Sequence, residues 1–183
     1  MYLKKRFGLS NIVSTLVVLV VAVLLAGLAT YFGVNTTTTR TSYESLQFDS
    51  EHVWVNGTGC VAAARVQAVG GKDLLIDKIT VRTHDCHWSN VYFYRVPVNA
   101  ELSSDMNLTS SASLTGASVT LFGKEYIQAT DDIPLMSGGE VLIYVKDPGY
   151  IGVDDIGTIV NIKVFTNNAE YGTEINVESA TSN

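Results

Sequence analysis

The sequence has 183 residues, of which 46% are hydrophobic and 16% charged, and its net charge is −6. Past residue 8, nine basic side chains stand against 18 acidic ones, so phosphate groups repel this part of the chain. The composition therefore excludes nucleic acid as a partner, and the length allows one ordinary domain behind an N-terminal apolar segment.

The apolar segment covers residues 9–34 and follows the basic cluster Lys4, Lys5 and Arg6. As a helix, its 26 residues would be about 39 Å long, enough to cross a hydrocarbon core of ~30 Å. The next basic residue is Arg40, so the positive-inside rule places residues 1–8 in the cytoplasm and the remainder outside. We therefore expect a membrane helix that carries an exported head.

Three fates of the apolar segment remain open. A secretory signal would be cut after Ala29, within AGLATY, and the mature chain would lose the helix. A signal anchor would stay uncut. The third fate is a cut between Gly8 and Leu9, which would remove the basic residues and keep the whole helix.

The basic residues, Gly8, the peptide LSN and the long apolar run, in this order, resemble the class III signal peptide of archaeal type IV pilins and archaellins. Phe7 departs from that pattern, because a basic or small residue commonly precedes the glycine. Val13 stands where bacterial pilins carry a glutamate, which archaeal members typically lack. The resemblance implies that residues 1–8 are a signal peptide and that a prepilin peptidase cuts between Gly8 and Leu9. It also implies that the pilus assembly machinery then builds a helical homopolymer at the cell surface.

In such a filament the helix would pack against the same helix of neighbouring subunits, since small residues let helices approach closely. Candidate core residues are Leu16, Val20, Val23, Leu24, Gly27 and Leu28. A Thr-rich polar stretch follows at residues 35–42, and Tyr43, Leu46 and Phe48 then share one helical face. The pattern predicts a helix over 9–50, whose apolar core is 9–34, and a head over 51–183.

The head is predicted to consist of strands separated by turn residues. Residues 60–81 alternate on both sides of Gly70-Gly71, which predicts a hairpin. Further strands are predicted at 91–96, 118–123, 125–129, 140–146, 158–166 and 174–179. Short strands without a second helical pattern favour a β-sandwich. The predicted class is therefore α+β, a long apolar helix followed by an antiparallel sandwich head, which the family resemblance makes immunoglobulin-like.

Two cysteines, Cys60 and Cys86, are expected to form one disulfide if the head is exported. The predicted hairpin would bring them to opposite ends of paired strands, where a bond is geometrically allowed. Three N-x-[ST] sequons, at Asn35, Asn56 and Asn107, are candidate glycosylation sites in an exported head.

No arrangement of residues in the sequence indicates catalysis or a cofactor. The peptide THDCHW supplies too few ligands for a structural zinc site, and His84 and His87 would point to opposite faces of a strand. The acidic pairs at 131–132 and 154–155 lack the spacing of a calcium loop. We therefore expect a protein that is not an enzyme.

Three functions fit these observations. The first is the structural subunit of an archaeal pilus-like filament that serves surface adhesion, with an archaellum subunit as a close variant. The second is a membrane-anchored, exported β-domain that binds a ligand or another cell-surface protein as a monomer. The third is a minor, non-polymerising member of the pilin-like group. A purified extracellular filament separates the first function from the others, and the mature N-terminus does nearly as well.

Overall fold

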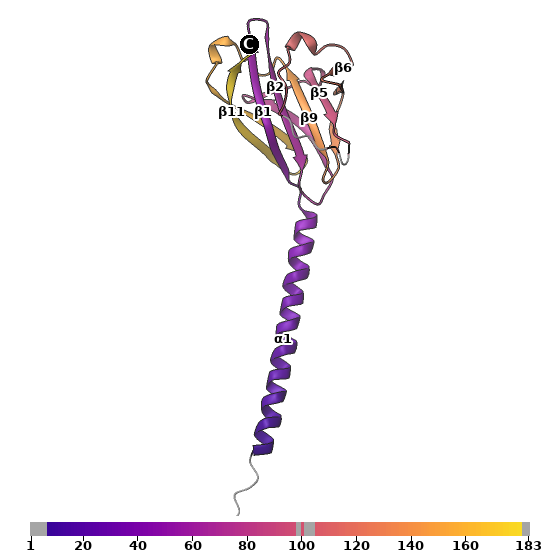
Figure 1. Ribbon diagram of the computed structural model, residues 1–183, viewed down its shortest axis with the longest axis vertical. Coiled ribbons are helices and arrows are strands. Elements are labelled where there is room, and N and C mark those ends of the chain that lie inside the picture. The colour runs from indigo at the N-terminus through magenta and orange to yellow at the C-terminus, as the bar shows by residue number, and fades with distance from the viewer. Residues whose placement is uncertain (1–6, 98–99, 101–104, 181–183) are drawn as a thin grey trace, which may run out of the picture. The chain divides into compact units, whose positions relative to one another are not determined.

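The computed structural model describes residues 7–97, 100 and 105–180, and the chain divides into two compact units between Ser42 and Tyr43. The first unit is helix α1 (Phe7–Ser42), and the second unit, the head, is built of strands (Figure 1). The strands are β1 (Leu46–Asn56), β2 (Gly59–Ala68), β3 (Leu74–Val81), β4 (His84–Asp85), β5 (Val91–Arg95), β6 (Ser118–Leu121), β7 (Lys124–Gln128), β8 (Ile133–Leu135), β9 (Glu140–Lys146), β10 (Ile159–Thr166) and β11 (Glu170–Ser179). Short 3-10 helices are η1 (Trp88–Asn90), η2 (Ser111–Ser113) and η3 (Val153–Asp155). The expected α+β class is confirmed.

Helix α1 ends earlier than the sequence pattern indicated. The predicted helix over 9–50 is wrong beyond Ser42, because strand β1 begins at Leu46. The carbonyl of Tyr43 accepts a hydrogen bond of 3.1 Å from the N–H of Gly71, so the backbone before β1 is bound to the turn between β2 and β3. Leu46 is buried through its pairing with Ala68 rather than on a helical face.

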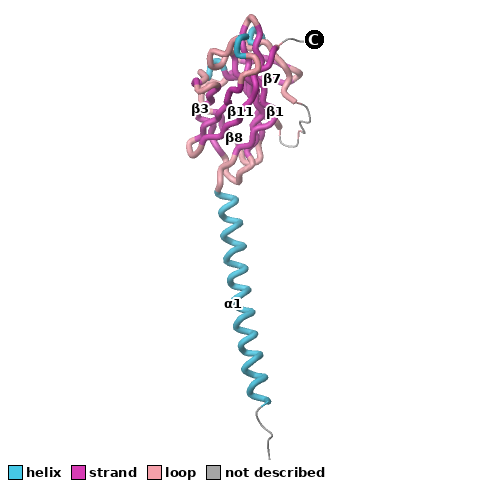
Figure 2. Tube along the Cα trace, turned by 90° about the vertical axis from the view of Figure 1, so that its left-hand side faces the viewer, coloured by secondary structure: helices cyan, strands magenta, loops and turns pink. Residues whose placement is uncertain are grey.

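Within the described residues, the head is one mixed, strongly curled sheet of eleven strands (Figure 2). The strand order is β4-β3-β10-β11-β1-β2-β9-β5-β7-β6, and β8 pairs with β3. The expectation of a wholly antiparallel sheet is wrong at one ladder, because β1 and β11 pair in parallel. This ladder joins the first strand of the head to its last, and it connects the two halves of the curled sheet.

The hairpin predicted over 60–81 is also wrong. Strand β2 pairs with β1 and β9, whereas β3 pairs with β10, β4 and β8. Side chains of β2 are buried on both faces of the sheet, so this strand needs a partner along each edge and lies centrally. The connection around Gly70 therefore leads from one half of the curled sheet to the other.

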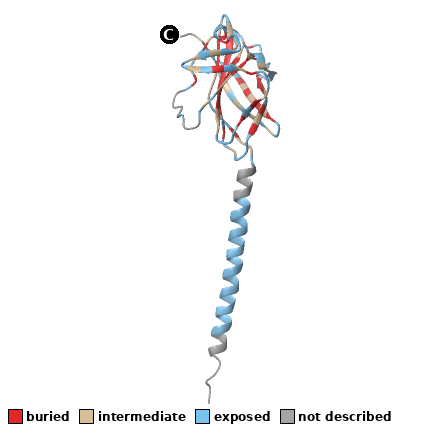
Figure 3. Cartoon of the chain, turned by 90° about the vertical axis from the view of Figure 1, so that its right-hand side faces the viewer, coloured by how far each residue is buried: buried red, intermediate tan, exposed pale blue. Residues whose placement is uncertain are grey.

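The buried residues of the head (Figure 3) form two hydrophobic clusters, to which alternate residues of β2 contribute. The inner cluster holds Ala62 and Ala64 of β2 together with side chains of β3, β9 and β10. The outer cluster holds Val61 and Ala63 of β2, and the segment 105–117 contributes Met106 and Leu114 to it. Buried tyrosines in this cluster keep their hydroxyl groups hydrogen-bonded, Tyr92 to the carbonyl of Gly116 at 3.1 Å and Tyr144 to that of Asn107 at 2.7 Å.

Most of the predicted strands are present. Those at 91–96, 118–123, 125–129, 140–146, 158–166 and 174–179 are confirmed as β5, β6, β7, β9, β10 and β11, with ends that differ by a few residues. Strand β8, which contains Pro134, was not predicted. A proline is tolerated there since β8 pairs along only one edge, with β3, among the described residues.

Candidate functional site

The central span of α1, Asn11–Thr36, has a predominantly apolar surface. Between Asn11 and Thr36, 26 residues form a helix long and apolar enough to cross a membrane, and every residue in it is exposed (Figure 3). The candidate core residues follow this pattern: Leu16 is 61% exposed, Val20 46%, Val23 64%, Leu24 62% and Leu28 54%. The surface at Gly27 is open, since no neighbouring atom lies within 4 Å of the place that a Cβ would occupy. A helix with this surface requires lipid or other protein around it.

Three threonine hydroxyl groups within this span are hydrogen-bonded to the backbone of the helix. The hydroxyl groups of Thr15, Thr30 and Thr36 donate to backbone carbonyls one turn earlier, at 2.9, 2.8 and 2.8 Å. Each hydroxyl hydrogen is therefore paired with a backbone oxygen and does not need a water molecule as its partner. The span therefore tolerates an apolar environment despite its threonines, since buried polar groups cost little once they are hydrogen-bonded.

The predicted cleavage site lies in the first turn of α1, which begins at Phe7. The backbone of Gly8 and Leu9 is helical, while residues 1–6 lie outside the described part of the chain. Cleavage of the Gly8–Leu9 bond stays a prediction.

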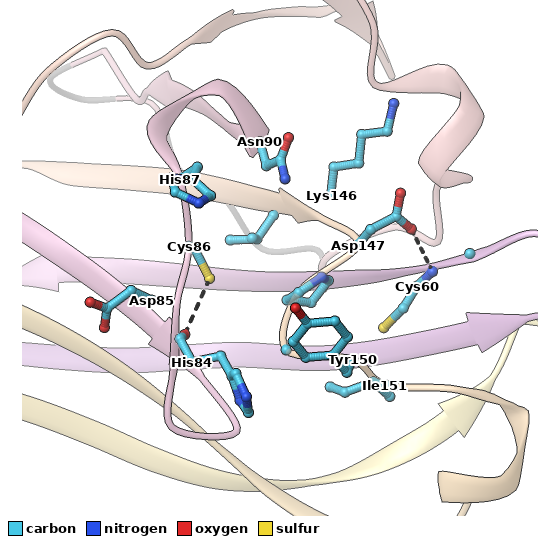
Figure 4. A pocket seen from close by; sticks show the side chains of 14 residues that line it. Cys60, His84, Asp85, Cys86, His87, Asn90, Lys146, Asp147, Tyr150 and Ile151 are labelled. Atoms are coloured by element: carbon cyan, nitrogen blue, oxygen red, sulfur yellow. Dashed lines mark hydrogen bonds between the residues drawn. The ribbon is translucent and has the colours of Figure 1, made fainter.

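The two cysteines are free thiols in the structure, so the predicted disulfide is not formed there. We inferred the disulfide from export of the head, and the hairpin that was expected to bring the cysteines together is absent. Both cysteines nevertheless line one pocket, Cys60 from the start of β2 and Cys86 from the segment after β4 (Figure 4). Burial raises the pKa of Cys60 to about 12 and that of Cys86 to about 11. Both thiols are therefore protonated at neutral pH and are poor nucleophiles. The disulfide stays a prediction.

The same pocket collects the histidines of THDCHW. His84 and His87 both line it, because the strand there comprises only His84 and Asp85 and the chain turns into η1. The prediction that the two rings point to opposite faces assumed one strand that holds both histidines, whereas His87 lies outside β4. Within the described part of the chain, no group of three or more His, Cys, Asp or Glu side chains is placed to hold a metal ion.

In each acidic pair, one carboxylate accepts a hydrogen bond from a backbone N–H group nearby in the chain. Asp155 forms an ion pair of 2.9 Å with Arg82 and accepts a hydrogen bond of 2.9 Å from the N–H of Gly152. These contacts lower the pKa of Asp155, the hydrogen bond from Gly152 contributing most. Asp131 accepts a hydrogen bond of 2.9 Å from the N–H of Asp132 and so shapes its loop.

The three sequons differ in their surroundings. Asn35 is exposed on α1, and Asn107 is exposed but is followed by Thr109, which is buried. Asn56 lies at the tip of the β1–β2 hairpin, where its side-chain oxygen accepts bonds from the N–H and hydroxyl of Thr58 at 2.9 and 2.7 Å. Asn56 is partly buried whereas Asn107 is exposed, so both sequons of the head stay candidate glycosylation sites.

A polar cluster that the sequence did not reveal joins three distant segments. The ring of His52 on β1 lies between two carboxylates, with Nε2 at 2.9 Å from Asp105 and Nδ1 at 3.2 Å from Glu178. The ring also stacks on Trp54, with centroids 4.7 Å apart. Only the protonated ring donates from both nitrogens, and the bond from His52 is the largest cause of the lowered pKa of Asp105. This contact ties the segment at 105 and the C-terminal strand to β1.

Comparison with known proteins adds no assignment: no family model matches the chain, and no curated protein matches it. The function therefore rests on the residues described above.

Proposed function

We propose that this protein is the structural subunit of an archaeal extracellular filament of the type IV pilus kind, built from many copies joined through α1. The observation that carries the proposal is the apolar surface of Asn11–Thr36, exposed around the whole helix. Such a surface is unstable in water, because each buried Val or Leu side chain is worth roughly 1.5–3 kcal/mol. Lipid covers it in the membrane, and the same helix of neighbouring subunits covers it in the filament.

The distribution of charge supports a helix that leaves the membrane. Lys4, Lys5 and Arg6 hold the N-terminus at the cytoplasmic face, and no charged residue follows until Arg40. Cleavage between Gly8 and Leu9 by a prepilin peptidase removes this cluster. The remaining helix then passes from lipid into a protein core without carrying a side-chain charge through an apolar environment.

The head is proposed to lie outside the filament core and to serve surface adhesion. We interpret its curled sheet as an immunoglobulin-like sandwich, because the inner cluster lies between β2 and β9 on one side and β3 and β10 on the other. The head is proposed to carry glycans, with Asn56 and Asn107 as its candidate sites, and to have no catalytic activity. Its location is the cell surface, and its partners are identical subunits and the pilus assembly machinery.

A second candidate function is a membrane-anchored binding module that stays monomeric. The pocket lined by Cys60, His84 and Tyr150 favours it, since a monomer needs a ligand site on the head. An archaellum subunit and a minor pilin are variants that share the processing and the helix with the filament subunit.

Isolation of sheared surface filaments tests the proposal. Peptide mapping is expected to find this chain as the major component, and N-terminal sequencing is expected to start at Leu9. A mature chain that starts at Thr30 would refute the filament, because the core helix would be gone. An uncut chain confined to the membrane fraction would favour the binding module.

A further inference from the structure

The head holds a pocket of about 490 Å³ beside the tip of the β1–β2 hairpin. The β1–β2 ladder starts with the pair Leu46–Ala68 and ends at the hairpin with the pair Asn56–Gly59. The pocket lies at the hairpin end, because Gly59 lines it. The pocket is lined by Gly59 and Cys60, by residues between 84 and 90 and by the end of β9 with the loop that follows (Figure 4). Its volume suits a small ligand of one or two sugar rings.

The loop after β9 is held in a strained conformation at the rim of this pocket. Asp147, Gly149 and Tyr150 have φ angles of 45°, 57° and 54°, a region that residues with a side chain seldom adopt. Gly149 is required, since a side chain there would lie 2.6 Å from the carbonyl of Val81. Backbone strain of this kind collects at ligand sites, where the surrounding structure maintains it.

The strained loop presents an aromatic ring to solvent. Tyr150 is 89% exposed, although the next residue, Ile151, is buried. The ring of His84 lies against it, with centroids 5.3 Å apart and planes at 77°, so one edge contact orients the tyrosine ring. An exposed, oriented aromatic face is a stacking platform for an apolar surface of a ligand.

The polar groups around the ring are mainly neutral or already paired. Lys146 donates to the carbonyl of Leu114 at 3.2 Å, and the carboxylate of Asp147 accepts from the N–H of Cys60 at 3.0 Å. The side chains of His87 and Asn90 line the pocket, and within the described residues neither makes a side-chain hydrogen bond. The pocket thus offers an amide, an imidazole and a fixed carboxylate, which suit hydroxyl groups better than a strong charge.

We propose that this pocket binds a neutral saccharide. The C–H face of a sugar ring stacks on Tyr150, while its hydroxyl groups exchange hydrogen bonds with Asn90, His87 and the second oxygen of Asp147. The binding itself is independent of filament formation. Its role as the contact point of an adhesive fibre rests on the proposed function.

The test uses the full chain in a zwitterionic detergent without a sugar headgroup, because glycoside detergents would compete for the pocket. Saturation-transfer-difference NMR is recorded with glucose, galactose, mannose and N-acetylglucosamine. Variants Tyr150→Ala and Asn90→Ala remove the platform and one hydrogen-bonding group. The matched control is Tyr43→Ala, since Tyr43 is also an exposed tyrosine, 64% accessible, but does not line the pocket.

At least one sugar is expected to show a saturation signal, and Tyr150→Ala is expected to weaken its affinity roughly two- to tenfold or more. Tyr150→Phe should bind almost as well as the wild type, and Tyr43→Ala should bind equally well. Absence of a signal from all four sugars, or an affinity unchanged in both Tyr150→Ala and Asn90→Ala, would overturn the proposal. Fibre formation is scored separately in cells that express Tyr150→Ala, so a failure of this site is distinguished from a failure of the filament.

Discussion

Replacement of Val20 by aspartate should abolish filament assembly while leaving membrane insertion largely intact. Val20 is 46% exposed in the single subunit, and in a filament core this surface would be covered by neighbouring helices. The substitution loses about 1.5 kcal/mol of apolar burial. It also buries an unpaired carboxylate, at a cost of several kcal/mol even after relaxation. A total of about 5 kcal/mol for each subunit corresponds to a loss of roughly a thousandfold or more in association.

Membrane insertion tolerates the same change better. Insertion scales assign an aspartate near the middle of a helix only about 2.5–3.5 kcal/mol, and the other apolar residues of α1 offset this cost. Electron microscopy should therefore find no fibres, whereas immunoblots should find the chain in the membrane fraction. Val20→Leu controls for side-chain shape. Val153→Asp controls for an added charge at an apolar residue of the head that is 49% exposed. Normal fibres from Val20→Asp would refute the packing argument.

Three further predictions concern the head. Denatured, unreduced protein from the cell surface should carry no thiol that reacts with maleimide if Cys60 and Cys86 are bridged after export, and two labelled thiols would exclude the bridge. Asn56→Gln should lower the intact mass of the surface protein by one glycan, and an unchanged mass would show that this sequon is unused. Asp105→Asn should destabilise the head by about 0.5 kcal/mol at pH 7, because the carboxylate accepts a bond from His52. The pKa of Asp105 is lowered from its ordinary value of 3.8, so its contribution is present above pH 3.8 and is lost as the pH falls through the lower pKa of the folded state. The free energies of unfolding that urea titration gives for the variant and the wild type should therefore converge in acid. An equal difference at pH 7 and in acid would contradict the assignment of this contact.

The elements that the sequence predicted well are those with local signals. The apolar run at 9–34 has one stable backbone conformation in an apolar environment, so its length alone indicates a helix. Strand β9 is a short apolar run between turn residues, and β10 alternates regularly, with buried Val160, Ile162 and Val164. The spacing of apolar residues and the identity of turn residues depend only on neighbours in the chain, so they can be recognised in a single sequence.

The errors arise where partners are distant in the chain. Tyr43, Leu46 and Phe48 have a spacing that suits a helical face, but pairing with β2 determines that segment. Likewise the glycine pair after β2 indicates a turn without specifying which strand the chain pairs with afterwards. Register and order in a sheet depend on contacts between distant segments, and these leave no local pattern.

The candidate sites also divide into those with a local signal in the sequence and those formed by distant segments. The cleavage motif and the apolar core are contiguous in sequence, so they can be proposed from the sequence alone, and both stay predictions. The contact of His52 with Asp105 and Glu178 spans most of the head, and no spacing could have indicated it. The pocket was missed for a similar reason, since Tyr150 and His84 meet only after β3 and β9 have folded.

Cryo-electron microscopy of filaments sheared from cells tests the central claim most directly. The proposed function predicts a core of closely packed helices into which residues 9–34 can be built with Leu9 as the first residue, and strand-rich heads outside that core. A filament whose core consists of another protein, or cells in which this chain occurs only as a membrane-bound monomer, would contradict it.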